Sequence, residues 1–213
     1  MLWDTDIDLM GYHSSLKPKQ YGIDLSKNLQ VNLEVHAELG VARNADRHVI
    51  TNGLLESEKG DIVDYLIGIR YLNEWNTTVI AEYYHNGFGF SRDEFQSYHG
   101  FLLNSLTVGT QSAIQQTLGV TQTYFRSSTL MKDYLYVRVS QPEPFDWLYF
   151  TPSIFTIYNL NDNSFLLSAS LGYRPATNLE FILWPSVLVG EEKTEFGSRQ
   201  ARERVELWLR VYF

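Results

Sequence analysis

Charged side chains recur at every second position in several segments of this chain, and the spacing decides what chemistry they could do. In residues 31–41, for example, Glu34, His36 and Glu38 alternate with aliphatic residues. Alternate side chains of a strand share one face, so such a segment predicts a strand with one polar and one apolar side. Acidic side chains gathered on the polar face of a closed sheet would select ions by charge.

Extending this parity along the chain assigns one set of charged residues to a common inward face. The acids are Asp4, Asp6, Asp8, Asp24, Glu34, Glu38, Asp64, Glu82, Glu180 and Glu206, and the bases are Arg70, Arg138, Arg174, Arg204 and Arg210. Because acids outnumber bases, a pore lined by this face would prefer cations. We assign its selectivity to Glu34, Glu38, Arg70, Glu82, Arg138, Glu180, Glu206 and Arg210. His36 is interpreted as a hydrogen-bonded filler.

A plugged interior is the alternative, in which the same acids and arginines pair in a low-dielectric space. A small barrel favours the plug because its interior has room only for side chains, and a wider barrel favours the pore.

The alternation predicts about ten strands. They are expected at residues 2–12, 19–26, 29–42, 62–72, 77–86, 132–140, 147–158, 164–174, 179–189 and 203–213. Every second connection is short, whereas 43–61, 87–131 and 190–202 are predicted as long loops. Short turns at one end, longer loops at the other and an even strand number are typical of outer-membrane barrels. Most strands have about 9–12 residues, the length a tilted strand needs to cross a bilayer.

A soluble barrel of the lipocalin type would show the same alternation with its apolar face inside. The membrane alternative is favoured because the polar faces carry hardly any lysine and the chain ends on Phe213. Aromatic residues also fall near strand ends, as interfacial girdles require. The predicted fold is therefore all-β: an antiparallel, up-and-down transmembrane β-barrel in a single domain, residues 1–213, with one long extracellular loop that carries a short helix.

Several function classes are made improbable by composition. The 213 residues include 25 acidic and 17 basic side chains, for a formal charge of −8, which argues against nucleic acid as a partner. There is no cysteine, so disulfides and thiolate metal sites are excluded. We expect no cofactor and no bound metal. Three aspartates at Asp4, Asp6 and Asp8 could hold Ca²⁺, but a solvated face is the preferred interpretation.

The C-terminal segment "RVELWLRVYF" (204–213) resembles the last strand of Gram-negative outer-membrane proteins. The segments "AEYYHNGFGFS", "YLYVRVSQPEPFDWLYFTP", "NLNDNSFLLSASLGYRPATNLEF" and "TEFG" are similar to the C-terminal half of a proteobacterial family of outer-membrane, porin-like barrels without an assigned activity. The resemblance covers roughly residues 60–213. It implies the outer membrane of a Gram-negative bacterium as location, and membrane lipid and the barrel assembly machinery as partners. It brings no catalytic residues.

Two features of the chain depart from that family. Residues 1–4 do not form a secretory signal, and family members are roughly twice as long. Either the mature numbering starts at an artificial Met1 or the chain is the C-terminal part of a longer barrel, and we favour the second interpretation.

The longest predicted loop, 87–131, contains a helix signal. Ser91 and Glu94 form a potential capping box before a helix expected over 92–106. Phe95, Tyr98 and Leu102 follow at helical spacing and are predicted to fold into the mouth of the barrel as a constriction. A helix that only covers the rim, or a disordered loop, is the alternative.

A hydrolase at the rim of the barrel is the last function class to consider. His85 and His99 are the plausible bases, with Ser91, Ser97 and Asp93 nearby in the sequence. No recognisable motif surrounds them, so an enzyme is not expected.

The expected function is thus a porin-like channel for passive diffusion of small solutes, with oligomerisation left open. A non-conducting structural or adhesive barrel that binds a partner through loops 43–61 and 87–131 is the second hypothesis. A hydrolase at the rim is the third.

Overall fold

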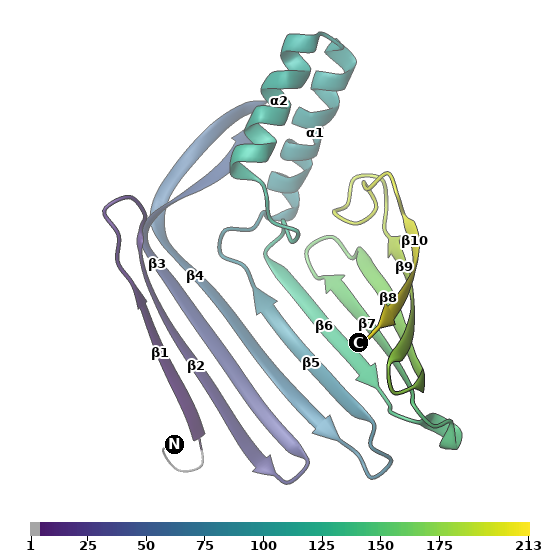
Figure 1. Cartoon of the computed structure of the whole chain (residues 1–213). Helices are drawn as coiled ribbons and strands as arrows, with labels where there is room; N and C mark the ends of the chain where they lie inside the picture. Colours follow the sequence, from purple (N-terminus) through teal and green to yellow (C-terminus); the bar gives the residue numbers. More distant parts are fainter. Residues whose placement is uncertain (1–4) are drawn as a thin grey trace.

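A computed structural model describes residues 5–213 as a single antiparallel sheet in which each strand pairs with the next one along the chain (Figure 1). Its strands are β1 (Thr5–Tyr12), β2 (Lys19–Gln30), β3 (Leu33–Thr51), β4 (Leu54–Leu72), β5 (Thr78–His85), β6 (Asp133–Ser140), β7 (Phe150–Asn159), β8 (Phe165–Ala176), β9 (Leu179–Val189) and β10 (Glu203–Val211). The helices α1 (Arg92–Val108) and α2 (Gln111–Tyr124) lie between β5 and β6, and a short 3-10 helix (Pro144–Asp146) lies between β6 and β7. The predicted all-β, up-and-down order is confirmed.

The sheet is curved but open, so the expectation of a closed barrel is not met by the described residues. Within them β1 pairs with β2 alone and β10 with β9 alone. These two strands form opposite edges of the sheet (Figure 1). Closure needs enough strand tilt and curvature for the two edges to meet, and the curvature of these ten strands stops short of that.

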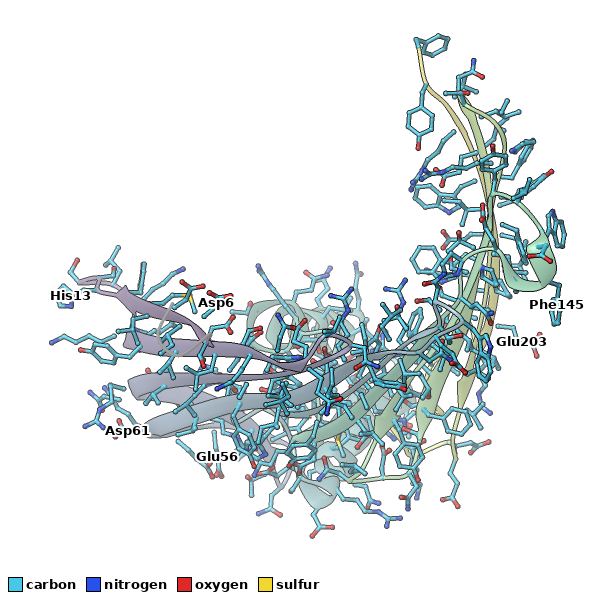
Figure 2. The ribbon with its side chains drawn as sticks, turned by 90° about the horizontal axis from the view of Figure 1, so that it is seen from below. Asp6, His13, Glu56, Asp61, Phe145 and Glu203 are labelled. Atoms are coloured by element: carbon cyan, nitrogen blue, oxygen red, sulfur yellow. The ribbon has the colours of Figure 1, made fainter. Side chains whose placement is uncertain are left out.

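The alternation of polar and apolar positions becomes a difference between two faces. One row of cross-strand partners runs through Asp6, Ser26, His36, Gly68, Glu82, Tyr136, Ile157, Leu166 and Leu188. Asp6 lies on the concave side of the sheet and Glu203 on the convex side (Figure 2). Cross-strand partners share a face, so this row and the residues two positions away from it are concave, and the intervening residues are convex.

The prediction of a loop over residues 43–61 is wrong, because β3 and β4 continue as a paired hairpin through this whole segment. Its turn is formed by Asn52 and Gly53, with φ of 52° and 78°. Two consecutive positive φ values define the two-residue hairpin turn for which Asn-Gly is the strongest sequence signal. Some charged side chains of this segment lie exposed on the ribbon, such as Arg43 and Asp61, which form an ion pair at 2.9 Å, whereas Arg47 is buried.

The best-buried cluster of the protein lies at the loop end of the sheet. It joins residues of the β3 extension, α1, the segments on either side of the helices, β6 and the β9–β10 loop. Its members are Val49, Ile50, Phe90, Phe95, Tyr98, Met131, Tyr134 and Phe196. The two helices project from this end of the sheet (Figure 1). Neither helix in the described chain is long and apolar enough to cross a membrane.

The open edges lead to a first prediction. A variant with Leu9→Cys in β1 and Leu207→Cys in β10 should give no intramolecular crosslink with a short bis-maleimide, because these strands lie at opposite edges. Electrophoresis of the reacted, purified protein measures the outcome, and the chain has no cysteine of its own to interfere.

The matched control carries Leu183→Cys with Leu207→Cys, which are direct partners between β9 and β10 and should crosslink readily. A crosslinked monomer for the β1–β10 pair would show that the ten strands close on themselves.

Candidate functional site

The structure places all eight predicted selectivity residues on the concave face. Glu34, Glu38, Arg70 and Glu82 belong to β3, β4 and β5, and Arg138, Glu180, Glu206 and Arg210 belong to β6, β9 and β10. Their register follows directly from the strand pairing, for example Glu34 opposite Arg70 and Glu180 opposite Arg210. The arrangement is the one that the parity of the sequence predicts; their role in selectivity stays a prediction.

A histidine bridges two of the carboxylates on β3 and β5. His36 Nε2 lies 3.2 Å from Glu82 Oε1, and Nδ1 lies 4.0 Å from Glu34 Oε1. Gly68 separates His36 from Glu82 in the register, and a Cβ on Gly68 would come within 2.2 Å of the His36 ring. The missing side chain therefore lets the imidazole reach across β4. His36 is a hydrogen-bonded residue of the polar face, as the sequence indicated.

A second cluster surrounds Glu180 at the turn end of β9. Its carboxylate lies 3.0 Å from Arg174 Nε and 3.5 Å from Arg210 Nη1 and accepts a 2.8 Å hydrogen bond from the Tyr212 hydroxyl. Two arginines thus share one carboxylate, which leaves a net positive charge at this place. Arg138, by contrast, has no ion-pair partner within residues 5–213.

The convex face is apolar and exposed. Large aliphatic side chains lie open on it from the first strand to the last: Leu9, Leu39, Ile67, Ile69, Leu135, Ile154, Leu167, Leu183, Val205, Leu207 and Leu209. Ile67 in the middle of the sheet is 58 % exposed and Leu207 is 74 % exposed. The largest apolar patch on a typical soluble monomer covers only a few hundred Å². A face of this kind, extending from β1 to β10, is suited to an apolar environment or partner.

The predicted constriction residues lie in the buried cluster at the loop end. Phe95 and Tyr98 are 3 % and 4 % exposed, and Leu102 packs against the same cluster. The cluster also contacts Ile157, Leu166 and Leu188, which lie in the concave row defined above. The base of α1 is therefore anchored on the concave side at this end of the sheet. A disordered loop is excluded; whether the helix narrows an opening or covers a rim is not decided by the packing.

The predicted helix is confirmed, with the capping box at its start. The Ser91 side chain accepts from the Glu94 amide, and the Glu94 side chain accepts from the Ser91 amide at 2.7 Å. The second helix, α2, was missed because 111–124 is rich in Gln and Thr and carries a weak apolar stripe. Its start at Thr110, which accepts from the Ala113 amide, is a local signal that could have revealed it.

An ion pair that the sequence did not indicate fixes the helices to the β3 extension. Arg47, only 9 % exposed, donates to both Glu94 oxygens at 2.9 and 2.6 Å and to the Gly89 carbonyl at 2.6 Å. Burial opposes ionisation of Glu94, but the hydrogen bonds from Arg47 and Ser91 outweigh it and lower the pKa of this carboxyl to about 2. The pair forms only because β3 continues past the segment in which a loop was expected.

A buried carboxylate orders the loop between β9 and β10. Glu195, 1 % exposed, accepts hydrogen bonds from the Tyr134 hydroxyl at 2.7 Å, from Asn159 Nδ2 at 2.8 Å and from the Leu130 amide at 2.6 Å. Burial raises the pKa of Glu195, although these donors oppose the shift. The network ties three connections at the loop end to one another. Its residues are distant in the sequence, so no local pattern marks them.

The two histidines weighed for hydrolysis, His85 and His99, lie apart from the candidate serines. His85 Nδ1 lies 2.7 Å from Asp133, which also accepts from the Tyr83 hydroxyl at 2.6 Å. By register this group belongs to the convex side, at the loop end of β5 and β6. Neither candidate serine joins it: Ser91 caps α1, and the Ser97 hydroxyl donates to the Asp93 carbonyl.

His99 stacks on Phe95 and takes no part in the His85–Asp133 pair. Asp6 and Asp8 share the concave face of β1, and Asp4 lies outside the described residues. Within residues 5–213 no group of three or more His, Cys, Asp or Glu side chains has the geometry of a metal site.

In comparisons with known proteins, no family model, no curated protein and no solved structure matches this chain.

The Arg47–Glu94 pair generates a second prediction. Glu94→Gln should weaken docking of the α1–α2 hairpin by about 2–3 kcal/mol, because Arg47 is left buried without its counter-charge. Amide hydrogen exchange in α1 should then be at least ~10-fold faster. Asp93→Asn is the control, since it removes a first-turn charge without touching Arg47.

The same pair sets a pH dependence. Because the pKa of Glu94 is depressed in the folded protein, its contribution is complete above the ordinary value near 4.5 and is lost as the pH falls toward 2. Protection of α1, corrected for intrinsic exchange, should fall in this window in the native protein and not in Glu94→Gln. Equal pH profiles in the two proteins would contradict the role assigned to the pair.

Proposed function

We propose that this chain forms part of the wall of a porin-like channel in an outer membrane, through which small solutes diffuse passively. The single observation that carries the proposal is the division of the sheet into an exposed apolar convex face and a charged concave face. In a transmembrane barrel the convex face meets lipid and the concave face lines water. A soluble sheet would place its apolar face in a core, and here that face is bare within the described chain.

The strand ends support this assignment. Tyr21, Tyr71, Phe150 and Tyr173 lie near strand ends and belong by register to the convex face. Aromatic rings near the strand ends, where the two membrane interfaces would lie, match the interfacial girdles of membrane barrels. Tyr21 and Tyr71 are 54 % and 42 % exposed, as residues that face lipid headgroups should be.

A channel also requires that the two edges of the sheet be paired. Lipid offers no hydrogen-bond partner to an open edge. Because β1 and β10 run antiparallel, an even number of further strands between them completes an up-and-down barrel without changing the face assignment of any residue. Such a barrel would be wider than one of ten strands, which favours an open lumen over one filled by side chains.

Reconstitution in planar bilayers, from a preparation in which both edges of the sheet are paired, tests the proposal. We expect stepwise conductance with a cation preference in a salt gradient, because acids outnumber bases on the concave face. A folded, membrane-inserted sample without conductance would contradict the channel.

The face assignment has its own matched pair of variants. Ile67→Lys places a charge on the convex face and should impair insertion by about 2–4 kcal/mol near the bilayer centre. Leu66→Lys, the neighbouring residue on the concave face, should insert like the native chain. Insertion is measured by floatation with vesicles, and equal behaviour of the two variants would contradict the lipid-facing role of the convex side.

A second candidate function is supported by the helical hairpin. Leu103, Leu106 and Leu118 are 47 %, 63 % and 50 % exposed on α1 and α2, which project beyond the loop end of the sheet. This surface favours a non-conducting barrel that binds a partner from outside. Inserted protein that never conducts, but whose helices become protected by a partner, would favour it over the channel.

A further inference from the structure

Charge on the concave face is divided between the two halves of the sheet. Outside the β3–β4 extension at 43–61, the described strands β1 to β5 carry Asp6, Asp8, Asp24, Glu34, Glu38, Asp64 and Glu82 on this face, with Arg70 as the only arginine or lysine there. The strands β6 to β10 carry Arg138, Arg174, Arg204 and Arg210 there, with Glu180 and Glu206 as the only carboxylates. One half is thus an acidic wall and the other a basic wall.

Contacts within each wall leave the excess charge free. On the acidic wall, Asp6, Asp8, Asp24 and Glu38 take part in none of the ion pairs of the described chain, whereas Glu34 contacts Arg70 at 3.7 Å. On the basic wall, Glu206 is paired with Arg204 at 2.8 Å, and Glu180 is shared by two arginines. Arg138 and one of the arginines at Glu180 therefore remain uncompensated.

The curvature turns the two walls toward each other. The strands from β1 to β5 and the strands near the C-terminus lie on two sides of the concave space (Figure 2). Charges of opposite sign on facing walls create a field across that space, and walls of low dielectric concentrate it. A solute that carries both charges lowers its energy by aligning with this field, whereas a simple cation is attracted by one wall and repelled by the other.

The basic wall also offers a place for an anionic group. A groove of about 440 Å³ is lined by Arg138, Arg174, Thr151, Ser153 and Ser170, and the carboxylates of Glu143 and Glu180 also line it. A guanidinium binds a carboxylate through two parallel hydrogen bonds, and neighbouring hydroxyls add further donors. Arg138, which has no ion-pair partner within residues 5–213, is the group in this groove best able to bind an added carboxylate.

We infer that the channel favours small zwitterions over ions of a single charge, with the carboxylate of the solute toward Arg138 and its cationic end toward the acidic wall at Asp24 and Glu38. The inference rests on the proposed function and names its substrate class. A lumen that is uniformly acidic would instead favour simple cations alone.

Vesicle swelling with the inserted protein distinguishes these cases. The probes are glycine betaine as zwitterion, choline as cation and erythritol as uncharged solute of similar size. Glycine betaine should enter at least ~3-fold faster than erythritol, a ratio that corresponds to a preference of about 0.7 kcal/mol.

Variants of the two walls separate the field from net charge. Arg138→Gln with Arg174→Gln should remove the advantage of glycine betaine and increase the preference for cations. Asp24→Asn with Glu38→Gln should remove the same advantage and decrease the preference for cations. Glu203→Gln, on the convex face (Figure 2), is the control and should change neither.

Each outcome decides between the alternatives. Loss of zwitterion preference from either wall, with opposite changes in the salt reversal potential, supports the inference. The inference is overturned if the native protein admits glycine betaine no faster than erythritol. It is also overturned if the rate of glycine betaine entry in the variants follows the net charge of the concave face alone. Either result leaves the proposed channel intact. Absence of all conductance and swelling contradicts the proposed function itself.

Discussion

The backbone ladder between consecutive strands is the constraint on which the remaining structure depends. Each strand pairs with its neighbour in chain order, so one row of partners runs from Asp6 in β1 to Leu188 in β9. The position of each strand residue relative to this row determines whether its side chain lies on the concave or the convex face. A shift of one residue in any hairpin would move its aliphatic side chains to the polar side and its carboxylates to the apolar one. The separation of chemistry between the two faces is therefore a consequence of register.

The loop end is organised by different forces. There the chain leaves the alternating pattern and buries a compact cluster around Phe95, Tyr98 and Met131. Two buried charged groups at this end have internal partners: Arg47 donates to Glu94 and to the Gly89 carbonyl, and Glu195 accepts from Tyr134, Asn159 and the Leu130 amide. Burial of a charge without such partners would be costly. The result is a sheet whose turn end is simple and whose loop end is a packed, specific structure, which is the end where selectivity or recognition is expected.

Polarity and charge sign are distributed on different scales. Polar and apolar residues alternate along each strand with a period of two residues, and this alternation distinguishes the two faces of the sheet. The sign of the charges changes only between the first and second halves of the chain, so it distinguishes one wall from the other. Neither property has an effect on a solute until curvature brings the walls to face each other. The mutual arrangement of Asp24 and Glu38 with Arg138 and Arg174 thus links the fold to the proposed preference for dipolar solutes.

The sequence by itself determined the strands, their order and their faces, because side-chain parity along a strand is local and each hairpin joins neighbours. It also determined α1, since the capping box of Ser91 and Glu94 is complete within four residues. Tertiary structure decided what depends on distant partners. The β3–β4 extension is stabilised by packing and by the ion pair between its own Arg47 and Glu94 of α1, which no local pattern shows, although Asn52-Gly53 marked the turn. The Glu195 network joins residues far apart in the chain. Whether the sheet closes depends on curvature summed over all strands, which no local pattern encodes.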